Sequence, residues 1–192
     1  MQDALAFGGA AISLLNHADR VRSACIAQLV NVIAPIMTET GGPAWRQTIF
    51  WPFANFTNFG HGHVLRAKVT SDTYDTDYFD PAGMDDEVRT PVTDVPYLKL
   101  AAVDDGKGGL TLFALNRDLT GEMRMEVDAR GMSNLSIVQA TTLHDADLDA
   151  VNTKANPDRI IPKTLEAVTI DGAHITAILP PASWSVIRLK AE

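Results

Sequence analysis

The sequence predicts a mainly β protein in which an antiparallel β-sandwich follows a short α/β segment. Two observations support this fold class. Residues 1–60 are apolar, with long hydrophobic runs, whereas residues 61–192 alternate short hydrophobic segments with turn residues. The charge divides in the same way: residues 1–60 hold three basic and three acidic residues, so the whole net charge of −8 lies in residues 61–192. We therefore place a domain boundary at residue 60.

The first expected element is a helix over residues 4–17. The glycine pair Gly8-Gly9 lies inside it, where each glycine costs about 1 kcal/mol relative to alanine. Such a pair indicates that another backbone packs closely against the helix. The apolar run is too short to span a bilayer, and it follows Asp3 rather than a basic residue, so a secretory signal is not favoured.

A buried strand and a second helix are expected next. Residues 24–33 are apolar on both faces, which is typical of a strand inside a parallel sheet. Residues 44–59 follow a Gly-Gly-Pro turn and predict a helix that Pro52 must kink or divide. One strand cannot form a parallel sheet alone. Residues 1–60 are therefore interpreted as an excerpt from a larger α/β domain, or as a segment that a partner chain completes.

The second part of the chain predicts at least seven short strands, the pattern of an antiparallel sandwich. Residues 122–128 alternate strictly, with Met123, Met125 and Val127 on one face. The residues between 104 and 109 form a hairpin loop, and Asp171-Gly172 forms a tight turn. The other expected strands are residues 95–103, 110–117, 135–143, 165–170, 174–179 and 183–189.

Composition excludes several classes of protein. The single cysteine, Cys25, rules out an internal disulfide framework and a cysteine zinc site. It fits a reducing compartment, so we expect a cytoplasmic location. An acidic chain without a basic stripe argues against binding to nucleic acid or to an anionic membrane.

The most informative polar residues are Gln28 and Asn31, because both lie within the expected buried strand. A buried amide without a partner costs about 1–3 kcal/mol. Each side chain must therefore bond either to a neighbouring side chain or to a ligand. The sequence leaves both alternatives open.

Other polar clusters favour ordinary structural roles. His61 and His63 would share a strand face, but no third ligand follows at metal spacing. Residues 72–87 contain seven carboxylates without the regular spacing of a calcium loop, so a solvated acidic loop is favoured. Asp19 and Glu39 lie near the expected strand, yet nothing arranges them as a catalytic pair. We assign no catalytic and no metal-binding residue.

Residues 17–53 (HADRVRSACIAQLVNVIAPIMTETGGPAWRQTIFWPF) closely resemble the C-terminal segment of α-L-arabinofuranosidases of glycoside hydrolase family 51. Residues 4–15 and 112–131 are similar to the same family. Its enzymes have a (β/α)8 barrel followed by a β-sandwich of jelly-roll type. The resemblance implies that residues 24–31 are the eighth barrel strand, flanked by the last two barrel helices, and that residues 61–192 are the sandwich.

The resemblance also implies a function. The family consists of retaining enzymes that use two glutamates, and the motifs around both have no match in this chain. The whole enzyme would release terminal arabinofuranose from arabinoxylan or arabinan oligosaccharides, without a cofactor. Gln28 matches a family glutamine that bonds to the arabinofuranose ring, while Asn31 and Trp45 lie nearby without an assigned role. The chain alone would be inactive. Its expected partners are the rest of the barrel and, because a homo-oligomer is expected, further copies of the enzyme.

Two other classes of function compete with this hypothesis. A β-sandwich can bind carbohydrate without catalysis, by stacking sugars on exposed aromatic side chains. The possible platform residues are Tyr74, Tyr78, Phe79 and Tyr97. The sandwich could instead serve only in oligomerisation.

Overall fold

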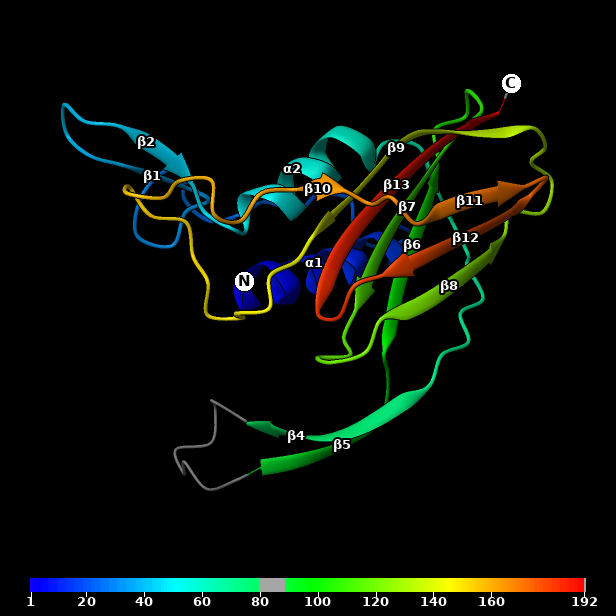
Figure 1. Cartoon of the computed structure of the whole chain (residues 1–192), viewed down its shortest axis with the longest axis horizontal. Coiled ribbons are helices and arrows are strands. Elements are labelled where there is room, and N and C mark those ends of the chain that lie inside the picture. The colour runs from blue at the N-terminus through cyan, green and yellow to red at the C-terminus, as the bar shows by residue number, and fades with distance from the viewer. Residues whose placement is uncertain (80–88, 192) are drawn as a thin grey trace.

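The computed structural model describes residues 1–79 and 89–191, and it is built around two antiparallel β-sheets packed face to face (Figure 1). Helices cover the outer face of the larger sheet. In chain order, the elements are α1 (Gln2–Asn16), β1 (Ile36–Thr38), β2 (Ala44–Arg46), α2 (Phe50–Phe59), β3 (His63–Leu65), β4 (Thr73–Phe79), β5 (Arg89–Pro96), β6 (Leu98–Asp104), β7 (Gly109–Asn116), β8 (Met123–Asp128), β9 (Leu135–Leu143), β10 (Lys163–Thr164), β11 (Val168–Asp171), β12 (His174–Leu179) and β13 (Ser183–Ala191).

The larger sheet has the strand order β10-β9-β13-β7-β6-β3. β13 lies in its middle, where Trp184 pairs with Leu115 of β7 and with Leu143 of β9. Successive residues of β13 are buried on both faces of the sheet. Two hydrophobic cores therefore meet at this strand, one on each side.

The first core lies between the larger sheet and the three-stranded sheet β11-β12-β8. Leu112 and Ile187 of the larger sheet pack with Met125, Ile175 and Leu179 of the smaller one. All five are almost fully buried. Alternate residues of each strand supply these side chains, as expected for two packed sheets.

The second core lies between the larger sheet and the helices. Ile12 of α1 packs there with Phe113 and Trp184. Phe56 of α2 stacks on Phe113, with ring centroids 4.6 Å apart and planes inclined by 27°. The helices of residues 1–60 therefore pack on the larger sheet and share a hydrophobic core with it.

Most strand predictions in the second part of the chain are confirmed. β9 and β12 occupy the predicted residues, and β8 buries Met125 while Arg124 and Glu126 point to solvent. The hairpin loop between β6 and β7 and the turn at Asp171-Gly172 also form as predicted. These turns depend on local sequence, which explains why they could be read from it.

The predictions for residues 20–59 need correction. No strand forms over residues 24–33, which are irregular apart from one bridge between Val30 and Ile36. The described chain offers this segment no sheet to join, and a strand cannot exist without a neighbour. The second helix is shorter than predicted, because residues 44–46 form β2. Pro52 does not kink it, since it lies in the first turn, where helical N–H groups have no partner.

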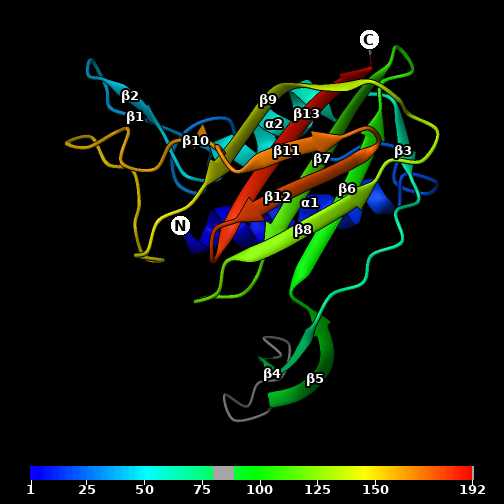
Figure 2. The same cartoon turned by 45° about the vertical axis from the view of Figure 1, so that its right-hand side comes forward.

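Strands β4 and β5 form a separate two-stranded ribbon that projects away from the two sheets (Figure 2). The prediction of a solvated loop over residues 72–87 is therefore wrong for the part that forms β4. The rest of that stretch lies outside the described residues. Across the described residues, no helix is long and apolar enough to cross a membrane.

Candidate functional site

Gln28 lies in the irregular segment that follows α1, with its side chain exposed to solvent. Its backbone has a positive φ of 58°, an unusual conformation for a residue other than glycine. Asn31 and Val32 share this feature, with φ values of 62° and 54°. The Gln28 amide makes no hydrogen bond to another described residue. Its role in substrate binding therefore stays a prediction.

Asn31 has a partner within the chain. Its amide nitrogen donates to the Thr38 hydroxyl at 2.9 Å, and its amide oxygen accepts from the Thr38 backbone N–H at 2.7 Å. The backbone adds a further bond, from the Asn31 N–H to the Ile36 carbonyl at 2.8 Å. Asn31 thus links the irregular segment to β1. Of the two alternatives that the sequence left open, the structure shows a hydrogen bond to a neighbouring side chain.

Trp45 lies opposite Met37 in the hairpin formed by β1 and β2. Its ring is half-buried, and its indole N–H is inaccessible to solvent without a hydrogen-bond partner among the described residues. A buried donor of this kind costs about 1–3 kcal/mol if it stays unpaired. A hydrogen-bond acceptor for the Trp45 indole N–H would therefore stabilise the hairpin.

The hairpin is held in place by the loop of residues 144–162. Asn152 is fully buried and donates to the carbonyls of Arg46 and Ile160, at 3.0 and 2.9 Å. Its amide oxygen accepts from the Ile160 N–H at 2.8 Å. The Trp51 indole, which donates to the Ile160 carbonyl at 3.0 Å, strengthens the same junction. Sequence reasoning missed Asn152, because only the fold brings these distant segments together.

The irregular segment exposes an unusual amount of apolar surface. Leu29, Val32 and Ile33 are 74%, 80% and 63% exposed. An exposed apolar patch of this kind marks a surface that a ligand, a partner or a further part of the protein covers. Gln28 and Asn31 lie among them, so the candidate site and the uncovered surface coincide.

The two acidic residues considered from the sequence, Asp19 and Glu39, each lie beside a basic side chain. Glu39 forms an ion pair with Lys154 at 2.7 Å, and Asp19 is solvent-exposed beside Arg20. A general acid needs a raised pKa. The pKa shifts that are resolved for carboxyl groups run the other way. Hydrogen bonds from backbone N–H groups lower the pKa of Asp105 and Asp118, and the Arg159 guanidinium lowers the pKa of Asp147.

The remaining candidates do not assemble into a site. Within the described ranges, no group of three metal-ligating side chains comes together, and both His61 and His63 are exposed. Tyr74 and Tyr97 pack against each other, with ring centroids 4.8 Å apart and planes inclined by 37°. Each ring thus covers part of the other instead of forming a flat platform. The side chains of Tyr78 and Phe79 lie outside the described residues.

Solved structures define the class of protein to which this fold belongs. A family 51 α-L-arabinofuranosidase from Bifidobacterium longum superposes with a TM-score of 0.84 at 36% identity, over 99% of this chain and 35% of that one. An α-L-arabinofuranosidase from Thermotoga maritima, solved as an arabinose complex, gives a TM-score of 0.83 at 26% identity, over 98% of this chain and 38% of that one. The fold is therefore that of one part of a family 51 glycoside hydrolase.

Sequence comparison identifies which part. The family described as "Alpha-L-arabinofuranosidase C-terminal domain" matches residues 1–183, and the chain belongs to this family. An "Intracellular exo-alpha-(1->5)-L-arabinofuranosidase" of Streptomyces lividans is 44% identical over 188 residues, which are 98% of this chain and 26% of the relative. A Bacillus subtilis protein, named "Intracellular exo-alpha-(1->5)-L-arabinofuranosidase 1", is 39% identical over 192 residues, all of this chain and 35% of the relative. The chain thus spans between about a quarter and about a third of these relatives.

Proposed function

We propose that this chain is the C-terminal portion of a retaining exo-α-L-arabinofuranosidase, which releases terminal arabinofuranose from arabinoxylan or arabinan oligosaccharides. The family match and the names of the relatives support the activity. The same names support an intracellular enzyme. The observation that carries the proposal is the uncovered apolar segment around Gln28, because a complete domain would bury it.

Residues 24–31 would become the eighth strand of a (β/α)8 barrel when the rest of the enzyme is present. Their sequence is apolar on both faces, as a barrel strand requires, and the positive φ at Gln28 would be released on pairing. In this proposal residues 1–60 close the barrel, and residues 61–192 form a jelly-roll sandwich beside it. The buried indole N–H of Trp45, which has no hydrogen-bond partner among the described residues, would find its acceptor in the added barrel.

Gln28 would then lie at the mouth of the barrel. Its amide would bond to the arabinofuranose ring and hold the sugar for attack. The two glutamates of the remaining barrel would perform the double displacement: one protonates the leaving oxygen, and the other forms the glycosyl-enzyme ester that water hydrolyses. This chain would contribute orientation of the sugar and no proton transfer, so it would be inactive alone. We further propose that the enzyme is a homo-oligomer.

The test joins this chain to the part of the Streptomyces lividans relative that it does not match, and measures hydrolysis of an aryl α-L-arabinofuranoside. We expect turnover by the fusion protein, and a loss of about 10²–10³-fold in kcat/KM for Gln28→Ala, the usual effect of removing a hydrogen bond to the transition state. Gln139→Ala is the matched control, because Gln139 is exposed on the sandwich. Full activity of the Gln28→Ala fusion would disprove the role of Gln28.

A further inference from the structure

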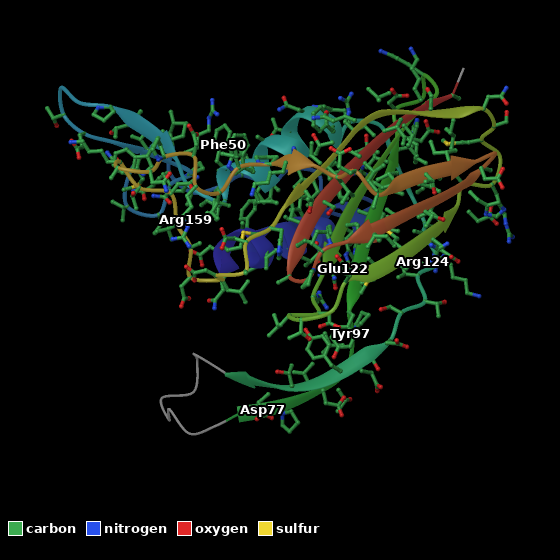
Figure 3. All side chains as sticks on the ribbon, viewed as in Figure 1. Phe50, Asp77, Tyr97, Glu122, Arg124 and Arg159 are labelled. Atoms are coloured by element: carbon green, nitrogen blue, oxygen red, sulfur yellow. The ribbon has the colours of Figure 1, made fainter. Side chains whose placement is uncertain are left out.

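The 144–162 loop is anchored in the core of the molecule although it is long and largely polar. Ala150 and Ile160 are almost fully buried in the hydrophobic core between the larger sheet and the helices, and Leu148 packs against the same core. The Arg159 guanidinium (Figure 3) bonds to a carboxylate of the same loop at 2.6 Å. A long loop that packs its own side chains in this way is a compact support for the segments it contacts.

The loop holds the hairpin of β1 and β2 at two points, and the two segments lie side by side (Figure 1). The fully buried Asn152 side chain donates to the Arg46 carbonyl of β2 at 3.0 Å. At the turn of the hairpin, the Lys154 ammonium forms an ion pair with Glu39 at 2.7 Å. Both contacts join residues of this chain, so neither requires any surface of the chain to stay open in the whole enzyme.

The hairpin continues this connection toward Gln28. Arg46 pairs with Ile36 across the hairpin. The Ile36 carbonyl in turn accepts a hydrogen bond from the Asn31 N–H at 2.8 Å, and Asn31 lies three residues after Gln28. An unbroken series of contacts therefore leads from Asn152, in the second part of the chain, to Gln28 in the first.

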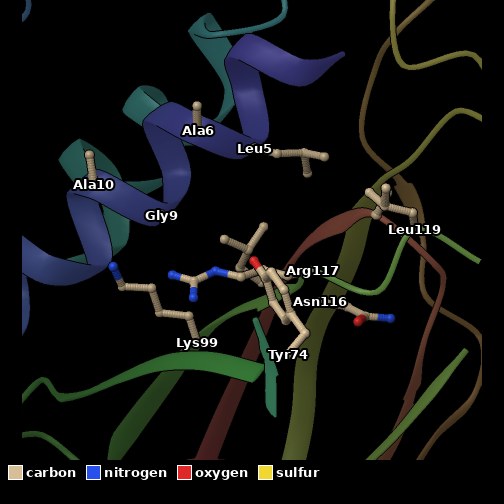
Figure 4. A pocket seen from close by; sticks show the side chains of 11 residues that line it. Leu5, Ala6, Gly9, Ala10, Tyr74, Lys99, Asn116, Arg117 and Leu119 are labelled. Carbon is tan, nitrogen blue, oxygen red and sulfur yellow. The ribbon is translucent and has the colours of Figure 1, made fainter. Parts of the chain in front are cut away.

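The sandwich also bonds to α1, but that contact leads elsewhere. Lys99 of β6 lines the pocket between α1 and the larger sheet (Figure 4) and donates to the Ser13 hydroxyl. The Ser13 hydroxyl donates to the Gly9 carbonyl of the same helix at 3.4 Å. This contact therefore ends within α1. It gives a matched control for the contact that leads to Gln28.

We infer that Asn152 is a positioning residue for Gln28 in the proposed arabinofuranosidase. A group that bonds to a reacting substrate must be held within about 0.5 Å of its productive position, and a displacement of about 1 Å can cost about 10²-fold in rate. The bond from Asn152 to Arg46 supplies part of this constraint through the hairpin. The sandwich thereby takes part in orienting the sugar without touching it. The inference rests on the role of Gln28 in the proposed function.

A double-mutant cycle in the fusion protein tests whether Asn152 acts through Gln28. Asn152→Ala should lower kcat/KM for the aryl α-L-arabinofuranoside by at least about tenfold when Gln28 is present. In the Gln28→Ala fusion the same substitution should lower it by less than about twofold, because the group that it positions is already absent. A residue that only stabilises the fold would lower activity by the same factor in both proteins, and that result would overturn the inference.

Two further variants make the cycle specific. Lys99→Met removes the bond to Ser13 and should change kcat/KM by less than about twofold. Lys154→Glu places a carboxylate opposite Glu39 at an exposed position that the fold tolerates, so it serves if Asn152→Ala fails to fold by circular dichroism. It should lower kcat/KM by about two- to fivefold, again only when Gln28 is present. An active fusion that ignores both Asn152→Ala and Lys154→Glu would overturn the positioning role and leave the proposed function standing.

Hydrogen exchange in this chain alone tests the structural connection without any activity. Asn152→Ala should speed exchange of the Asn31 and Thr38 N–H groups by at least about tenfold more than it speeds exchange in β12, because the hairpin that holds them is released locally. Lys99→Met should leave both groups unchanged. Unaltered exchange at Asn31 and Thr38 would overturn the inference, whereas an inactive wild-type fusion would contradict the proposed function.

Discussion

Gly8 of α1 lies directly against the indole ring of Trp184. A Cβ atom built on Gly8 would lie 2.7 Å from Cε3 of that ring, closer than any real contact. Trp184 is fully buried, and its indole N–H donates to the Asn55 side chain at 3.1 Å. The glycine pair was predicted to admit another backbone. Gly8 instead admits a side chain, through which α1 meets β13 and α2.

Gly8→Ala should therefore destabilise the fold. The methyl group gains about 1 kcal/mol of helix propensity but overpacks a rigid core, which costs typically about 1–3 kcal/mol. We expect a net loss of about 1 kcal/mol in the free energy of unfolding, measured with urea. Gly9→Ala is the matched control, because its Cβ would meet only the flexible end of Leu115, at 3.1 Å. A Gly8→Ala variant as stable as wild type would contradict this packing.

Asn152→Ala should loosen the junction between the hairpin of β1 and β2 and the 144–162 loop. The substitution removes three hydrogen bonds and leaves the Ile160 N–H and the Arg46 carbonyl without their Asn152 partner, while the Ile160 carbonyl keeps its bond from the Trp51 indole. A loss of about 1–3 kcal/mol is expected. Hydrogen exchange should show faster exchange at Ile160, whose N–H bonds to the Asn152 side chain. Asn156→Ala, on an exposed residue of the same loop, should change neither quantity.

The turn after β7 should make stability depend on acid pH through Asp118. Its carboxylate accepts from the backbone N–H groups of Thr120 and Gly121, both at 2.9 Å, and these bonds lower its pKa. The contribution is therefore present in full above the unfolded pKa of about 3.9 and is lost as the pH falls through the lower folded value. Asp118→Asn should flatten this part of the curve, measured by urea unfolding at a series of pH values. An unchanged acid dependence would show that Asp118 does not contribute.

The sequence predicted those elements whose stability is local. β12 alternates between buried and more exposed positions and follows β11 through a two-residue turn, so its residues were identified correctly. Residues 24–33 failed as a strand because a strand is defined by its neighbours, and the described chain supplies none. The same dependence explains why the role of Gln28 can be predicted but not seen in this chain.

Specific contacts between residues that lie apart in the sequence could not be predicted from it either. Asn31 lies 7 residues from its partner Thr38. Asn152 lies 106 residues from Arg46 of β2, to whose carbonyl it donates. No periodicity marks them. A polar residue within an apolar run signals that a partner exists, as it did for Asn31, but the fold alone says which residue it is.

The most direct test of the central claim is hydrolysis of an aryl α-L-arabinofuranoside by this chain alone. The intact mass should be taken on the same sample, and cooperative urea unfolding should show that it is folded. We predict no turnover at a mass near 20.8 kDa, because the proposed function places both catalytic glutamates in the rest of the enzyme. Turnover at an enzymatic rate that is abolished by Asp19→Asn or Glu39→Gln would contradict the account and would place a complete active site on this chain.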